Sequence, residues 1–177
     1  PLGEPLVHHL AHRFRLQKTN PDAARSTVVK PIVFYVDRQA PPRIQQDLIE
    51  GASWWSKAFE QAGYIDAFKV ELMPEGASVL DARYNVINWV HRQTRGWSYG
   101  ENVIDPRTGE IIRGAVLLGS LRARQDQLIF EGLVGTKLTG SNDVNDPLRV
   151  VDARLKQLAA HETGHAIGLE HNFIAST

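Results

Sequence analysis

The feature that most constrains this chain is the stretch 161–171, which reads H-E-T-G-H-A-I-G-L-E-H. On a helix, residues four apart share one face with Cβ atoms about 5–6 Å apart, so His161 and His165 can bind one metal ion together. In a continuous helix, His171 would lie roughly 15 Å along the axis from His161. The helix must therefore end and the chain must turn back. Gly168 permits this turn because a residue without Cβ readily adopts positive φ.

Three histidines with one open coordination position are typical of a catalytic zinc site, whereas structural zinc sites are closed by four protein ligands. Glu162 lies next to His161 and can take a proton from a water on the metal. The alternative is an amphipathic helix whose histidines are surface or core residues. A bare H-E-x-x-H occurs by chance in roughly one chain in a hundred of this length, and Gly168 with His171 lowers that several-hundred-fold. The pattern therefore predicts a zinc site with His161, His165 and His171 as ligands.

Composition excludes several other classes of protein. The 177 residues are 42% hydrophobic and 23% charged, which is typical of one globular domain. Basic and acidic residues balance at 20 each, so no net field favours nucleic acid or anionic membrane. No apolar run approaches the 18 or so residues that span a bilayer. The absence of cysteine excludes disulfides, thiolate zinc ligands and a cysteine nucleophile.

Hydrophobic periodicity and turn residues predict an alternation of strands and helices. Trp54 and Trp55 are expected to be core anchors, and Phe14 with Leu16 to form a short strand. His8 and His12 are four residues apart, but no acidic neighbour supports a second metal site there. The expected strands are 31–36, 67–73, 84–91 and 114–119, with a hairpin at 102–112, and the expected helices are 42–62, 120–133 and 147–167.

Six stretches together resemble the metzincin clan of zinc metallopeptidases, and most closely the bacterial zinc-dependent metalloproteases with a Met-zincin-type catalytic domain. The resemblance covers about residues 30–177. The stretches are 30–37, 51–55, 83–91, 96–100, 104–111 and 161–173.

This resemblance implies an α+β, zincin-like fold with a twisted mixed sheet, a backing helix and an active-site helix. It implies an antiparallel edge strand that binds peptide by strand addition, for which 97–104 is the candidate. Trp97, Tyr99 and Asn102 are the corresponding candidate substrate contacts. Residues 1–30 are expected to be an N-terminal arm, the tail of a preceding domain. Residues 31–177 are expected to form the upper subdomain of the catalytic domain, truncated after the third zinc histidine.

A departure from the clan concerns the methionine-bearing turn that metzincins carry downstream of the third histidine. The single methionine, Met73, lies far upstream of the motif. It cannot supply that turn. We therefore expect the sequence to end before the Met-turn.

The function that the resemblance implies is that of a zinc-dependent endopeptidase, in which Glu162 is the general base for a zinc-activated water. The second ring nitrogens of the ligands should donate to carboxylates or backbone carbonyls, and Glu170 is the nearest acidic candidate. The expected partner is a peptide or protein and not nucleic acid, and the expected location is secreted, periplasmic or at the surface of a bacterium. Two alternatives remain: a non-catalytic zinc-stabilised module that binds peptide or glycan, and a zinc hydrolase of a non-peptide amide or ester.

Overall fold

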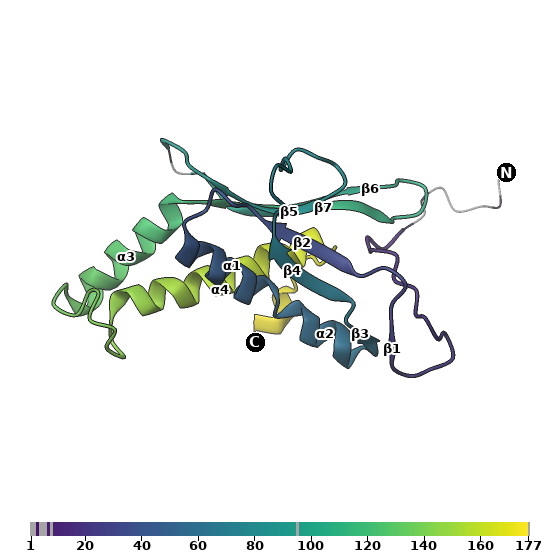
Figure 1. The fold of residues 1–177 in the computed structure, drawn as a ribbon, viewed down its shortest axis with the longest axis horizontal. Helices are drawn as coiled ribbons and strands as arrows, with labels where there is room; N and C mark the ends of the chain where they lie inside the picture. The colour runs from purple at the N-terminus through teal and green to yellow at the C-terminus, as the bar shows by residue number, and fades with distance from the viewer. Residues whose placement is uncertain (1–2, 4–6, 8, 95, 177) are drawn as a thin grey trace.

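The computed structural model describes residues 3, 7, 9–94 and 96–176, so His8 of the predicted arm lies outside the described residues. A five-stranded sheet of order β4-β2-β5-β7-β6 forms its centre (Figure 1). Strands β4, β2, β5 and β7 run parallel, and β6 pairs antiparallel with β7 at one edge. This confirms the predicted mixed sheet of an α+β fold. The strands are β2 Ile32–Val36, β4 Phe68–Leu72, β5 Asn85–Val90, β6 Tyr99–Ile104 and β7 Ile111–Gly119, and a small second sheet pairs β1 Ser26–Thr27 with β3 Tyr64–Ile65.

The helices lie on one side of the sheet, where α1 and α4 run side by side (Figure 1). Between them and the sheet lies the core, which includes the fully buried side chains of Phe34, Leu48 and Leu155. The loop 74–84 covers the other face of the sheet, where Arg113 Nη2 donates to Val79 O at 2.6 Å. The helices are α1 Pro42–Ala52, α2 Trp55–Gln61, α3 Leu121–Val134 and α4 Pro147–Ala166, and the 3-10 helix η1 is Phe173–Ser176.

The prediction of one helix over 42–62 is wrong, because the chain bends at Ser53 and Trp54 between α1 and α2. After the bend, Trp55 turns toward α4 and its indole Nε1 donates to Ala160 O at 2.8 Å. Trp54 is 54% exposed, so the prediction that it anchors the core is also wrong. The contact of Trp55 with α4, which local periodicity does not encode, accompanies this break.

The strand boundaries differ from the predicted ones at two places. Strand β7 continues through Gly114, where we expected a break between a hairpin arm and a separate strand. A Cβ at Gly114 would lie 2.6 Å from Phe34 Cζ, so this glycine allows close packing within the strand. Phe14 and Leu16 form no strand. They pack against the core, and an isolated bridge at Arg13 precedes them.

Two further features of the structure agree with the predictions made from the sequence. Asp146 caps α4 by accepting from Leu148 N at 2.9 Å, with Pro147 in the first turn. Met73 is buried just after β4, at the sheet edge opposite β6, and so does not form a turn after His171. In the part of the chain that the structure describes, no helix has the length and apolarity needed to cross a membrane.

The α1–α4 contact contains a buried acid with an expected pH signature. Asp47 is 4% exposed, and its Oδ1 lies 3.5 Å from Lys156 Nζ. Burial, followed by the charge of Asp152, raises the pKa of Asp47 from 3.8 to about 6, although Lys156 opposes the shift. Because the folded state holds this proton more tightly than the unfolded state, the free energy of unfolding should fall as pH rises from about 4 to about 6.

Replacing this acid should remove that pH dependence. The Asp47→Asn variant should show a flatter profile between pH 4 and pH 6, and should be more stable than wild type above pH 7 by about 1–2 kcal/mol. Urea unfolding across this range is the measurement. Asp22→Asn, at an exposed position, is the control and should follow wild type. An Asp47→Asn protein that is less stable than wild type above pH 7 would contradict this account.

Candidate metal centre

Three histidine side chains converge on one point at the C-terminal end of α4. The Nε2 atoms of His161 and His165 are 3.2 Å apart, and His171 Nε2 lies 3.1 Å from His165 Nε2 and 3.2 Å from His161 Nε2. Nitrogens at 2.0–2.1 Å from a tetrahedral zinc ion are separated by about 3.3 Å. The three ring nitrogens therefore fit a shared zinc ion and leave its fourth position free of these ligands.

The turn after α4 brings His171 back to the helix. Gly168 has φ +103°, a backbone conformation that residues with a side chain rarely adopt. Its amide donates to His165 O at 2.9 Å. The next amide, of Leu169, donates to Gly164 O at 3.0 Å. The structure thus places Gly168 at the reversal that the sequence predicts for it.

The same turn orients a second ligand. His165 Nδ1 lies 2.8 Å from Leu169 O, so the proton on Nδ1 donates to this carbonyl and the lone pair of Nε2 faces the metal point. The hydrogen-bond acceptor for His165 Nδ1 is therefore a backbone carbonyl. It is not the carboxylate of Glu170, which is the nearest acidic candidate in the sequence. Glu170 itself is exposed.

Close packing fixes the helix segment that carries the ligands. A Cβ on Gly164 would lie 2.9 Å from Trp55 Cζ2, so the indole ring lies directly on the helix backbone. The Trp55 indole also donates to Ala160 O, one residue before His161. This packing gives the metal ligands the rigid support that a preorganised site requires.

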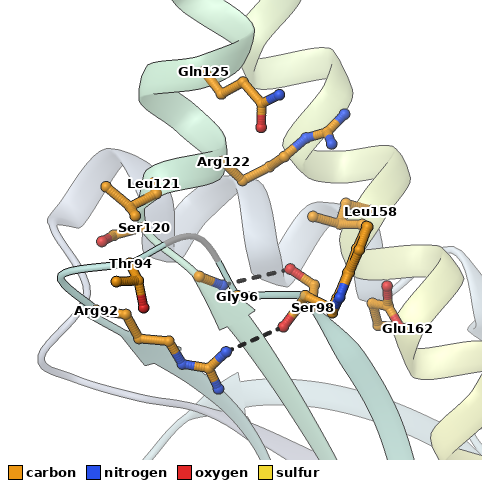
Figure 2. A pocket seen from close by; sticks show the side chains of 12 residues that line it. Arg92, Thr94, Gly96, Ser98, Ser120, Leu121, Arg122, Gln125, Leu158 and Glu162 are labelled. Atoms are coloured by element: carbon orange, nitrogen blue, oxygen red, sulfur yellow. Dashed lines mark hydrogen bonds between the residues drawn. The ribbon is translucent and has the colours of Figure 1, made fainter.

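Glu162 lies on the same helix but is buried, with only 6% of its surface exposed. It borders a cavity of about 140 Å³ between α4, the start of α3 and the segment before β6 (Figure 2). A single water needs only about 10–15 Å³ of such volume, so the cavity has room for several. The described lining includes Arg92, Trp97, Ser98, Arg122, Gln125 and Leu158 in addition to Glu162, and none of the three histidines.

The edge strand β6 lies against α4. A Cβ on Gly100 would lie 1.8 Å from Glu162 O, and Asn102 Nδ2 donates to His165 O at 3.2 Å. The Asn102 side chain is therefore engaged with the metal-site helix. Of the other candidate substrate contacts, Trp97 is 79% and Tyr99 is 40% exposed beside this edge.

The sequence does not predict the support from Asn102 and Trp55, and it predicts a carbonyl or carboxylate acceptor for the histidines without identifying Leu169 O. For Asn102 a signal existed, because side chains alternate along a strand, so Gly100 and Asn102 must share one face. In the structure this is the less exposed face of β6, which lies against α4. For Trp55 and Leu169 no signal existed, because their contacts depend on the approach of segments that are distant in sequence or on the course of a turn.

Comparison with known proteins agrees with this geometry. Residues 143–177, which include the cap of α4 and all three histidines, match the family model described as Met-zincin. No curated protein and no solved structure matches the chain. The family match and the histidine triad together support a metzincin-like domain, with zinc as its metal.

Proposed function

We propose that this chain, which carries a metzincin-like domain, is a zinc-dependent endopeptidase. The observation that carries the proposal is the convergence of three Nε2 atoms within 3.1–3.2 Å of one another, in a segment that matches the Met-zincin family. Zinc at this point supplies a Lewis acid that activates water and polarises the scissile carbonyl.

Glu162 is the general base in this proposal. Its carboxylate accepts the proton of the attacking water and later passes it to the leaving amine. The adjoining cavity of about 140 Å³, which the three histidines do not line, brings solvent to this otherwise buried group from the side of α3. Burial also keeps the proton transfer away from bulk solvent, where charge interactions are weaker.

Strand β6 is the proposed binding edge for the peptide. It pairs with β7 on one side, and the order of strands in the described sheet leaves its other edge without a partner strand. An extended peptide can add to such an edge through main-chain hydrogen bonds. Trp97 and Tyr99, whose rings are exposed, are the proposed contacts for its side chains.

Removal of the metal tests this function. Protein stripped by a chelator should lose cleavage of an unstructured protein by about 10³-fold or more, and one equivalent of Zn²⁺ should restore it, because the lowered water pKa depends on the ion. Undiminished cleavage by metal-free protein would refute the proposal. Zinc binding without cleavage would favour a binding module, and faster turnover of simple esters or amides than of peptides would favour a non-peptide hydrolase.

A further inference from the structure

The N-terminal segment passes directly behind the turn that returns His171 to the metal point. If Gly168 carried a Cβ, this atom would lie 2.3 Å from His12 O and 3.3 Å from His12 Cβ. The backbone of the turn therefore touches the backbone of the N-terminal segment. No side chain separates them.

The β6–β7 hairpin holds the other side of this segment. Arg13 N donates to Gly109 O at 3.1 Å, and Ile111 N donates to Arg13 O at 2.9 Å. Gly109 has φ +72°, and a Cβ there would lie 2.5 Å from Ala11 O. Residues 11–13 are thus in contact with a hairpin turn through Gly109 and with the metal-site turn through Gly168.

A core side chain anchors the segment just beyond this point. The ring of Phe14 packs edge-on against the fully buried Phe34, with centroids 6.3 Å apart. The neighbouring Arg15–Glu110 ion pair at 2.6 Å is more exposed, and pairs of this kind contribute little to stability. The packing of Phe14 and the hairpin hydrogen bonds therefore determine where residues 11–13 lie.

We infer that residues 11–14, here called the backing segment, position the zinc ligands His165 and His171. The Gly168–Leu169 turn positions both ligands. The carbonyl of Leu169 orients His165, and the reversal of the chain at Gly168 brings His171 to the other two histidines. The backing segment limits how far this turn can relax away from the helix. The inference rests on the proposed zinc site and makes the N-terminal segment a part of the metal centre.

The test perturbs the backing segment at its contact with the hairpin, through a residue that lies outside the metal-site turn. Gly109→Ala places a methyl group against Ala11 O, and its matched control is Gly76→Ala, where φ is +74° and no atom lies within 4 Å. The two glycines have nearly the same positive φ, so the control matches the strain that an alanine meets at such a φ. Loss of outer support for metal ligands typically costs 10–100-fold in affinity, so Gly109→Ala should raise the Kd for Zn²⁺ by about 10-fold or more. Gly76→Ala should stay within about two-fold of wild type, as measured by competition with a chromophoric chelator and without any peptide.

A second pair of variants covers the case in which Gly109→Ala does not fold. Phe14→Leu shortens the anchor, whereas Phe59→Leu makes the same change where Phe59 stacks on Phe68 at 5.6 Å. Both should lower the unfolding midpoint, but only Phe14→Leu should weaken Zn²⁺ binding. Equal Zn²⁺ affinity within either pair of variants would overturn the inference alone. A wild-type protein that binds no Zn²⁺ would overturn the proposed function as well.

Discussion

The Glu162→Gln variant should lose about 10²–10⁴-fold in kcat/KM for peptide cleavage while still binding one zinc ion per chain. Glutamine has nearly the same shape but cannot accept the proton of the attacking water. Since Glu162 is not one of the three converging ligands, zinc stoichiometry should not change. The side chain is also 6% exposed, so a neutral amide should cost no more to bury than a carboxylate.

Glu170→Gln is the matched control, because it alters the other glutamate of the motif at an exposed position. Its kcat/KM and zinc content should stay within about two-fold of wild type, as expected for an exposed surface position. Steady-state cleavage of a fluorogenic peptide and metal analysis of the same samples give both quantities. Full activity in Glu162→Gln would exclude the proposed base, and loss of zinc from that variant would make Glu162 a ligand.

The second large effect is expected at Gly100, where strand β6 touches helix α4. An added Cβ would lie 1.8 Å from Glu162 O and 3.0 Å from His165 Cβ. The first atom belongs to the helix backbone and cannot move aside by a change of rotamer. Gly100→Ala should therefore displace β6 from α4 and lower the free energy of unfolding by about 3 kcal/mol. Zinc affinity should fall as well, because the Asn102–His165 hydrogen bond is in the same contact.

Gly119→Ala provides the comparison in the neighbouring strand β7, where no atom lies within 4 Å of the added Cβ. An alanine in a strand at an open position should leave stability unchanged or raise it by about 0.5–1 kcal/mol. Urea unfolding of both apo proteins separates the two cases. Equal stability of the two variants would show that β6 does not pack on α4 as described.

The elements that the sequence predicts well are those whose signals are local. The cap at Asp146 and the apolar stripe that follows predict a helix over 147–167, and α4 spans Pro147–Ala166. The motif spacing and Gly168 likewise predict the reversal that brings His171 to the other two histidines. Each of these features depends on residues a few positions apart, so periodicity and turn chemistry are sufficient.

The features that the sequence does not predict depend on contacts between distant segments. The bend between α1 and α2 is accompanied by the contact of Trp55 with α4, more than 100 residues later. The close approach at Gly100 and the contact of His12 with Gly168 are of the same kind. A glycine that admits a neighbouring backbone looks like any other glycine in a single sequence, so only the folded structure identifies it.

The coordination of zinc in the reloaded protein tests the central claim most directly. X-ray absorption on protein stripped of metal and reloaded with one equivalent of Zn²⁺ measures the number and type of ligands. We expect one zinc ion per chain with three imidazole nitrogens at about 2.0–2.1 Å and one further oxygen from solvent. Protein that binds no zinc, or a spectrum that requires four protein ligands, would contradict a catalytic centre built from His161, His165 and His171.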